Sequence, residues 1–134
     1  MASKRKPRRA ANAIPDSQIL AWIESGLLFV RNPCNTNPAV HFRGRLLRAG
    51  LRMQGGRGQV NGGDRYSIEL RYHGKRRTIT RSKLVYMIMK RRCVPSGYVV
   101  HHNDLDRHND GACNLRAYSE AYHSIIHGIN PYDY

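Results

Sequence analysis

The sequence is poor in acidic residues and in long apolar runs. It holds nine Asp and Glu against 23 Lys and Arg in 134 residues, a formal net charge of +14. A basic balance of this size favours a polyanionic partner, and nucleic acid is the natural candidate. The plainer alternative is a solvated basic surface. No stretch approaches the ~18 consecutive apolar residues of a membrane span, so we expect no membrane partner.

Cysteine is scarce as well. Cys34, Cys93 and Cys113 make neither the disulfide framework of a small secreted protein nor a C-x-x-C metal knuckle. We therefore expect reduced thiols and a cytoplasmic location. The basic N-terminus is not followed by an apolar segment, so we expect no secretory signal.

The positive charge is concentrated in one part of the chain. Residues 1–92 hold 21 Lys and Arg and four acids, a net charge of +17, whereas residues 93–134 hold two and five, a net charge of −3. This split suggests a basic part that binds and a histidine-rich part that carries the chemistry.

The first periodic segment predicts a helix over residues 15–25. Asp16 is its expected cap, Gly26 its expected end, and Trp22 is expected to pack in the core. A short strand is expected at residues 27–30. The element type of the following Arg-rich segment, residues 41–52, stays open because two glycines interrupt it.

Two more elements precede the histidine-rich part. Alternating apolar residues over 66–72, a turn at 73–75 and a return strand over 76–80 predict a β-hairpin. Residues 81–92 predict a helix. Its expected buried stripe is Leu84, Val85, Ile88 and Met89.

Five of the seven histidines lie within residues 98–128. His101 and His102 close a predicted strand, where successive side chains point to opposite faces. His123 and His127 are four residues apart in a predicted helix capped by Ser119, so both imidazoles lie on one face. An imidazole from the strand would complete a three-ligand metal site with an open position. If His101 is that ligand, His102 faces elsewhere and is free to act on a water.

These residues resemble the HNH nucleases, whose fold is also called ββα-metal. The resemblance covers roughly residues 65–128. It rests on the His-His pair, on Asn114-Leu115, and on helical histidines nine and 13 positions beyond Asn114. The spacing is similar to that of colicin-type DNases with three histidine ligands. The upstream stretch also resembles phage HNH proteins, but His101 departs from their usual Asp-His pair.

The resemblance implies an α+β fold in which residues 65–134 are the HNH nuclease domain, with a β-hairpin and a helix before the ββα-metal module. Residues 14–64 would be an accessory DNA-binding region. Charge density and Pro7 predict that residues 1–13 are a disordered basic arm. It implies hydrolysis of DNA phosphodiester bonds with one divalent metal ion per chain, Zn, Mg, Ni or Mn. For a phage protein the location would be the host cytoplasm, and the role homing or packaging.

The placement and chemistry of these residues, together with the resemblance, suggest a role for each. His102 would be the general base, and the metal ligands would be His101, His123 and His127. Asn114 would fix the loop and orient His102, or alternatively ligate the metal, and Arg116 would contact the phosphate.

Other loop residues are less well placed. Asp104 and Asp106 are alternative ligands, although acids in turns are more often structural. His108 lies outside the pattern and is expected to be exposed.

The candidate DNA-binding residues are basic positions in three segments: Arg43, Arg45, Arg48, Lys75, Arg76, Arg77, Lys90, Arg91 and Arg92. Two other functions stay open. One is a ribonuclease, which the same chemistry permits. The other is a non-catalytic nucleic-acid-binding protein with a structural zinc site. Both a monomer and a homodimer are compatible with the sequence.

Overall fold

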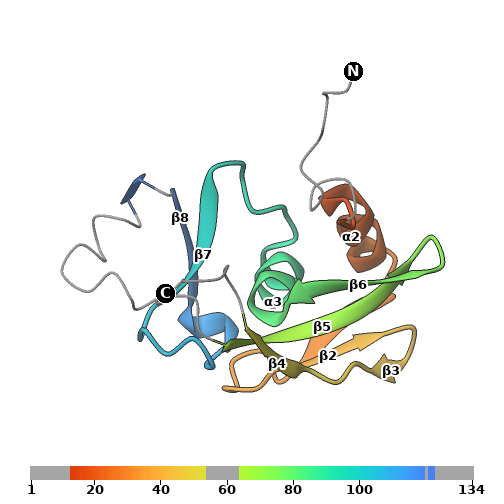
Figure 1. Cartoon of the computed structure of the whole chain (residues 1–134), viewed down its shortest axis with the longest axis horizontal. Coiled ribbons are helices and arrows are strands. Elements are labelled where there is room, and N and C mark those ends of the chain that lie inside the picture. Colours follow the sequence, from red (N-terminus) through yellow and green to blue (C-terminus); the bar gives the residue numbers. More distant parts are fainter. Residues whose placement is uncertain (1–12, 54–63, 120, 123–134) are drawn as a thin grey trace.

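The computed structural model describes residues 13–53, 64–119 and 121–122, which form an α+β fold (Figure 1). This described part holds two α-helices, α2 (Asp16–Glu24) and α3 (Arg81–Lys90), and small antiparallel sheets. Helix α3 is central, because it contacts α2 and strands of all three sheets. The predicted α+β class is confirmed.

The N-terminal helix α2 is present, but its predicted cap is wrong. Pro15 is the N-cap residue and Asp16 is the first helical residue, where its carboxylate is 3.1 Å from the ammonium of Lys83 on α3. An acid in the first turn suits the helix dipole, so Asp16 stabilises α2 without capping it. Trp22 packs edge-on against Phe42 beside the core, with 4.9 Å between ring centroids.

The Arg-rich segment of open type contributes strands to two sheets. The first sheet has the order β1-β2-β3, with β1 (Leu28–Arg31), β2 (Ala39–Phe42) and β3 (Arg45–Leu46). The second has the order β4-β5-β6, with β4 (Gly50–Met53), β5 (Asp64–Tyr72) and β6 (Lys75–Thr80). Gly44 has a φ of 80° in the turn between β2 and β3, which explains the break in the apolar pattern.

Strands β5 and β6 form the predicted hairpin. Its turn is His73-Gly74, and both residues have positive φ values, 53° and 78°, as a tight turn between twisted strands requires. Ile68 and Leu70 are almost fully buried, so the apolar face predicted from the alternation is the core face.

Helix α3 is buried on more sides than predicted. Leu84, Val85 and Ile88 are buried as expected, but Met89 is 45% exposed and Met87 is fully buried instead. The prediction assumed one apolar stripe, whereas elements pack around α3 on several sides.

The predicted strands of the histidine-rich part are also present. Strand β7 (Tyr98–His102) pairs antiparallel with β8 (Leu115–Ser119), and the 3-10 helix η1 (Ala112–Asn114) leads into β8. The Ser119 hydroxyl accepts a hydrogen bond from the backbone N–H of Tyr122 at 3.2 Å. Ser119 therefore caps the helical residues 121–122, as predicted.

A single hydrophobic cluster joins both sides of the predicted boundary at residue 64. Its members include Ile19 and Leu28 from the N-terminal side and Ile68, Leu84 and Leu115 from the C-terminal side. Of the helices in the described residues, none is long and apolar enough to cross a membrane.

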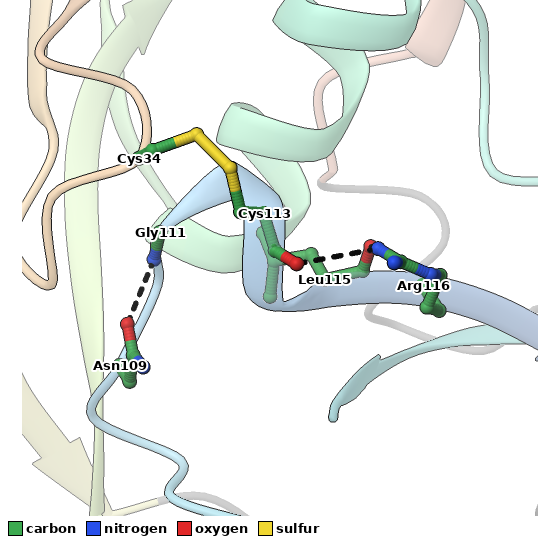
Figure 2. Close-up of a disulfide and its surroundings, with 6 residues drawn as sticks. All are labelled: Cys34, Asn109, Gly111, Cys113, Leu115 and Arg116. Atoms are coloured by element: carbon green, nitrogen blue, oxygen red, sulfur yellow. Dashed lines mark hydrogen bonds between the residues drawn. A yellow bond between two sulfur atoms is a disulfide. The ribbon is translucent and has the colours of Figure 1, made fainter. Parts of the chain in front are cut away.

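The prediction of reduced cysteines is wrong for two of the three. Cys34, in the loop between β1 and β2, forms a disulfide with Cys113 of η1 (Figure 2). The two positions are 79 residues apart, so no local spacing could pair them. Cys93 is free. The expected cytoplasmic location therefore loses the support that reduced thiols would supply.

Candidate functional site

The two histidines that end β7 point to opposite faces of the β7–β8 pair, as strand alternation predicts. His101 lies opposite Arg116, and its ring centroid is 5.5 Å from that of Tyr118. His102 lies opposite Leu115, on the face that packs against the core. Both imidazoles are buried.

The His101 face leads to the Ser119-capped segment. The ring of Tyr118 contacts the ring of Tyr122 at 5.0 Å between centroids. The predicted ligands His123 and His127 lie outside the described residues. Within residues 13–53, 64–119 and 121–122, no three His, Cys, Asp or Glu side chains are grouped as a metal site.

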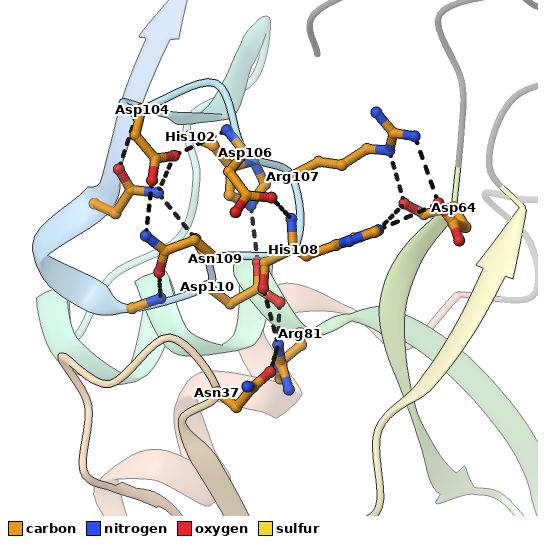
Figure 3. Close-up of polar contacts among 12 residues, drawn as sticks. Asn37, Asp64, Arg81, His102, Asp104, Asp106, Arg107, His108, Asn109 and Asp110 are labelled. Carbon is orange, nitrogen blue, oxygen red and sulfur yellow. Dashed lines mark hydrogen bonds and ion pairs between the residues drawn. The ribbon is translucent and has the colours of Figure 1, made fainter.

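The sequence predicted that the His102 side chain would be free. It is instead held by a hydrogen bond to a buried carboxylate (Figure 3). Its Nε2–H donates to Oδ1 of Asp110 at 2.8 Å. The other carboxylate oxygen accepts a hydrogen bond from Nε of Arg81 at 2.7 Å. The three side chains are each 5% exposed or less. Arg81, Asp110 and His102 thus form a continuous buried polar chain.

Arg81 connects this chain to three other parts of the molecule. Its Nη2 donates to Asn37 at 3.0 Å and to the carbonyl oxygen of His108 at 3.5 Å, and its guanidinium lies over the ring of Tyr66, 4.2 Å from the centroid. As the first residue of α3 it places a cation at a helix N-terminus, which the helix dipole disfavours. Asp110 compensates this charge.

Sequence reasoning missed both Arg81 and Asp110. One sequence signal was available. Arg81 is a basic residue at the start of a predicted helix whose first turn has no acid, so a carboxylate from elsewhere in the chain is needed to balance its charge. Asp110 lies in an Asn-Asp-Gly sequence, which is typical of turns and gives no sign of a buried partner.

Asn114 fixes the loop, as predicted. Its Oδ1 accepts the backbone N–H of Asp104 at 2.9 Å, and its Nδ2 donates to the Asp104 carboxylate at 3.0 Å and to the carbonyl oxygen of Asn109 at 2.9 Å. The side chain that contacts His102 is nevertheless that of Asp110.

The alternative ligand Asp104 is occupied by structural bonds. Its burial raises the pKa of the carboxyl, but hydrogen bonds from the Asn109 side chain, the Asp106 backbone and Asn114 outweigh this and lower the pKa. The Asp106 carboxylate likewise accepts a backbone N–H, that of His108, at 3.0 Å. Both acids therefore shape the turn.

The far side of the loop is tied to β5. His108, which was expected to be exposed, is half-buried, and its Nε2 donates to Asp64 at 3.2 Å. Nε of Arg107 donates to the Asp64 carbonyl oxygen at 2.9 Å. The hydrogen bond from His108 holds the pKa of Asp64 below its usual value.

The loop carrying Asp110 is also clamped by residues 32–38. The backbone N–H of Asp110 donates to the Thr36 carbonyl at 3.0 Å, and that of Ala112 to Pro33 at 2.6 Å. A Cβ on Gly111 would lie 2.8 Å from the carbonyl oxygen of Asn35. The N-terminal region, predicted to be accessory, therefore helps to build the site.

Arg116 is exposed, and its Nη1 donates to the carbonyl oxygens of Leu115 at 2.9 Å and Cys113 at 3.4 Å (Figure 2). Because Arg116 lies directly opposite His101 in the strand pair, its side chain starts from the same face as that of His101.

The predicted DNA-binding residues come from three segments: the turn and loop around β3, the β5–β6 hairpin, and the end of α3. Eight are exposed and Arg77 is half-buried. The eight exposed residues are Arg43, Arg45, Arg48, Lys75, Arg76, Lys90, Arg91 and Arg92. Arg76 also lies 3.8 Å from the carboxylate of Glu69, an exposed pair that contributes little to stability.

Comparison of the chain with protein families, curated proteins and solved structures found no match. The resemblance to HNH nucleases thus rests on the residues themselves.

Proposed function

We propose that the chain is a metal-dependent endonuclease that hydrolyses DNA phosphodiester bonds with an HNH-type ββα-metal module. The observation that carries this proposal is the different placement of the two histidines that end β7. His101 lies on one face, beside Tyr118, while His102 lies on the other face in a hydrogen bond to Asp110. This placement leaves His101 available as a ligand and His102 available as a base.

The His101 face fits a metal site. It presents an imidazole, and the Ser119-capped segment begins on this side through the contact between Tyr118 and Tyr122. His123 and His127, which follow this segment in the sequence, would be the other two ligands. Imidazoles favour Zn²⁺ or Ni²⁺ over Mg²⁺, which prefers oxygen, and Mn²⁺ stays a candidate. When bound, the ion would stabilise charge on the phosphate and on the leaving 3′ oxygen.

His102 would act as the general base. It would take a proton from the water that attacks phosphorus, which is the role of a general base in hydrolysis. Asn114 would keep the loop in place, and Arg116, on the His101 face, would contact the phosphate.

The basic segments would supply the affinity for DNA. Their exposed side chains include Arg43, Arg45 and Arg48 near β3, in the part of the chain that carries a net charge of +17. Contacts of this kind position the duplex without reading its sequence.

A second function is favoured by one observation. The His102 side chain is 4% exposed, and a histidine so deeply enclosed in an ion pair also suits a purely structural role. In that case the chain would be a non-catalytic nucleic-acid-binding protein with a structural zinc site.

Incubation of supercoiled plasmid with the full chain and each of Zn²⁺, Mg²⁺, Ni²⁺ and Mn²⁺, with and without chelator, decides between these functions. If the chain is an endonuclease, the plasmid should be nicked or linearised only in the presence of metal, and chelator should abolish the cleavage. Binding without any cleavage would favour the structural-zinc alternative. A parallel RNA substrate tests the ribonuclease, which predicts that RNA is cut in preference to DNA.

A further inference from the structure

We propose that Asp110 and Arg81 are positioning residues that hold the His102 ring in one orientation and one tautomer, with Nδ1 as the proton acceptor. This inference rests on the endonuclease function proposed above. It assigns roles to two residues that neither the spacing of the histidines nor the resemblance singled out.

The hydrogen bond between His102 and Asp110 selects the tautomer. A carboxylate only accepts hydrogen bonds, so Nε2 must carry the proton that it donates to Oδ1 at 2.8 Å. A neutral imidazole carries one proton, and Nδ1 is then the nitrogen with a free lone pair. Any proton that His102 takes from water must therefore arrive at Nδ1.

Arg81 keeps Asp110 ionised and aligned. Its guanidinium is a permanent cation, and its Nε lies 2.7 Å from the second carboxylate oxygen. Arg81 is itself held in place by Asn37 and by the face of Tyr66. Its guanidinium therefore cannot move along with Asp110 or turn toward solvent. The charges of Arg81 and Asp110 cancel, so the buried imidazole of His102 does not need to be charged.

The arrangement also suits the reacting state. As the water oxygen bonds to phosphorus, its O–H bond breaks and the proton passes to Nδ1. The bond from phosphorus to the 3′ oxygen breaks, and that oxygen takes a proton from solvent. The imidazolium formed on His102 then lies against the Asp110 carboxylate, whose charge stabilises it.

Asp110→Asn separates positioning from packing. The amide has the shape of the carboxylate, and Arg81 can only donate, so the amide oxygen turns toward Arg81. The amide NH₂ then faces His102 and donates to Nε2. The ring would switch to the Nδ1–H tautomer and lose its acceptor at Nδ1. In a serine-protease triad, the corresponding Asp-to-Asn change lowers kcat by about 10⁴-fold.

The experiment combines ¹⁵N NMR of the histidine rings with cleavage kinetics on the full chain. We expect the Nε2–H tautomer of His102 in the wild type and the Nδ1–H tautomer in Asp110→Asn. We also expect kcat to fall by about 10²-fold or more while KM stays within about 3-fold. Asp16→Asn, which removes a carboxylate paired with Lys83 instead, is the matched control and should change neither.

Two results would overturn the inference alone: an active wild type with the Nδ1–H tautomer, or an Asp110→Asn variant that keeps its kcat. The tautomer measured in the wild type tests the positioning role even if Asp110→Asn does not fold. A wild type that shows the Nε2–H tautomer but cleaves nothing would instead refute the endonuclease, and the positioning role with it.

Discussion

His102 and Asp110 are eight residues apart in the chain and meet in a buried hydrogen bond of 2.8 Å between Nε2 and Oδ1. The loop between them is fixed from three directions: by Arg81 of α3, by Asn114 next to β8, and by residues 32–38. The geometry of His102 therefore depends on parts of the chain far from the histidine-rich motif, and this dependence can be tested.

The first prediction concerns the disulfide. Replacement of both Cys34 and Cys113 by Ser should lower the free energy of unfolding, because the bond closes a loop with a sequence separation of 79. The chain-entropy relation gives about 4.5 kcal/mol as the scale of the effect. Thermal melting with and without reductant measures it. The double variant is its own control, since reductant should shift the wild type and leave the variant unchanged.

The second prediction concerns the contact at Gly111. Gly111→Ala places a Cβ 2.8 Å from the carbonyl oxygen of Asn35, so residues 32–38 or the loop of Asp110 must move. We expect a loss of about 1–3 kcal/mol in unfolding free energy by chemical denaturation. Gly50→Ala is the control, because its Cβ would meet nothing within 4 Å. Equal stability of both variants would show that the clamp is looser than the structure has it.

The third prediction concerns acid. The pKa of Asp104 is lowered in the folded chain, because its hydrogen bonds outweigh its burial. A lowered carboxyl pKa stabilises the fold above the unfolded value of ~3.9, and this contribution disappears as pH falls through the folded pKa. Asp104→Asn should therefore be less stable than the wild type at pH 6, and the difference should shrink as the pH falls below the ordinary carboxyl value. A stability difference that stays constant with pH would contradict this.

The fourth prediction concerns salt. If exposed arginines near β3 contact phosphates, the logarithm of the DNA binding constant should fall linearly with the logarithm of salt concentration. Replacing Arg43, Arg45 and Arg48 by Gln should reduce that slope by about 2 to 3 units, since each phosphate contact contributes about 0.9. The same positions changed to Lys are the control and should keep the slope. A slope that does not change would remove these residues from the interface.

Much of the local structure was predictable because it depends on neighbours in sequence. Strand alternation placed His101 and His102 on opposite faces, and the Ser119 cap and the His73-Gly74 turn followed from residue type. The errors have the opposite origin. Arg81 and Asp110 are 29 residues apart, and the two bonded cysteines are 79 apart.

The exposure of Met89 has the same kind of cause. A helix that packs on several sides does not show a single apolar stripe, and residue spacing carries no information about which distant segment approaches it.

The central claim is that His102 is a base and not a ligand. The most direct test is the cleavage rate of His102→Ala, measured with metal affinity on the same sample and beside His123→Ala. We predict that His102→Ala loses about 10²–10⁴-fold in rate while it keeps its metal affinity, its fold and its DNA binding. His123→Ala should lose metal affinity as well as rate. If His102→Ala loses metal as severely as His123→Ala does, His102 is a ligand and the account is wrong.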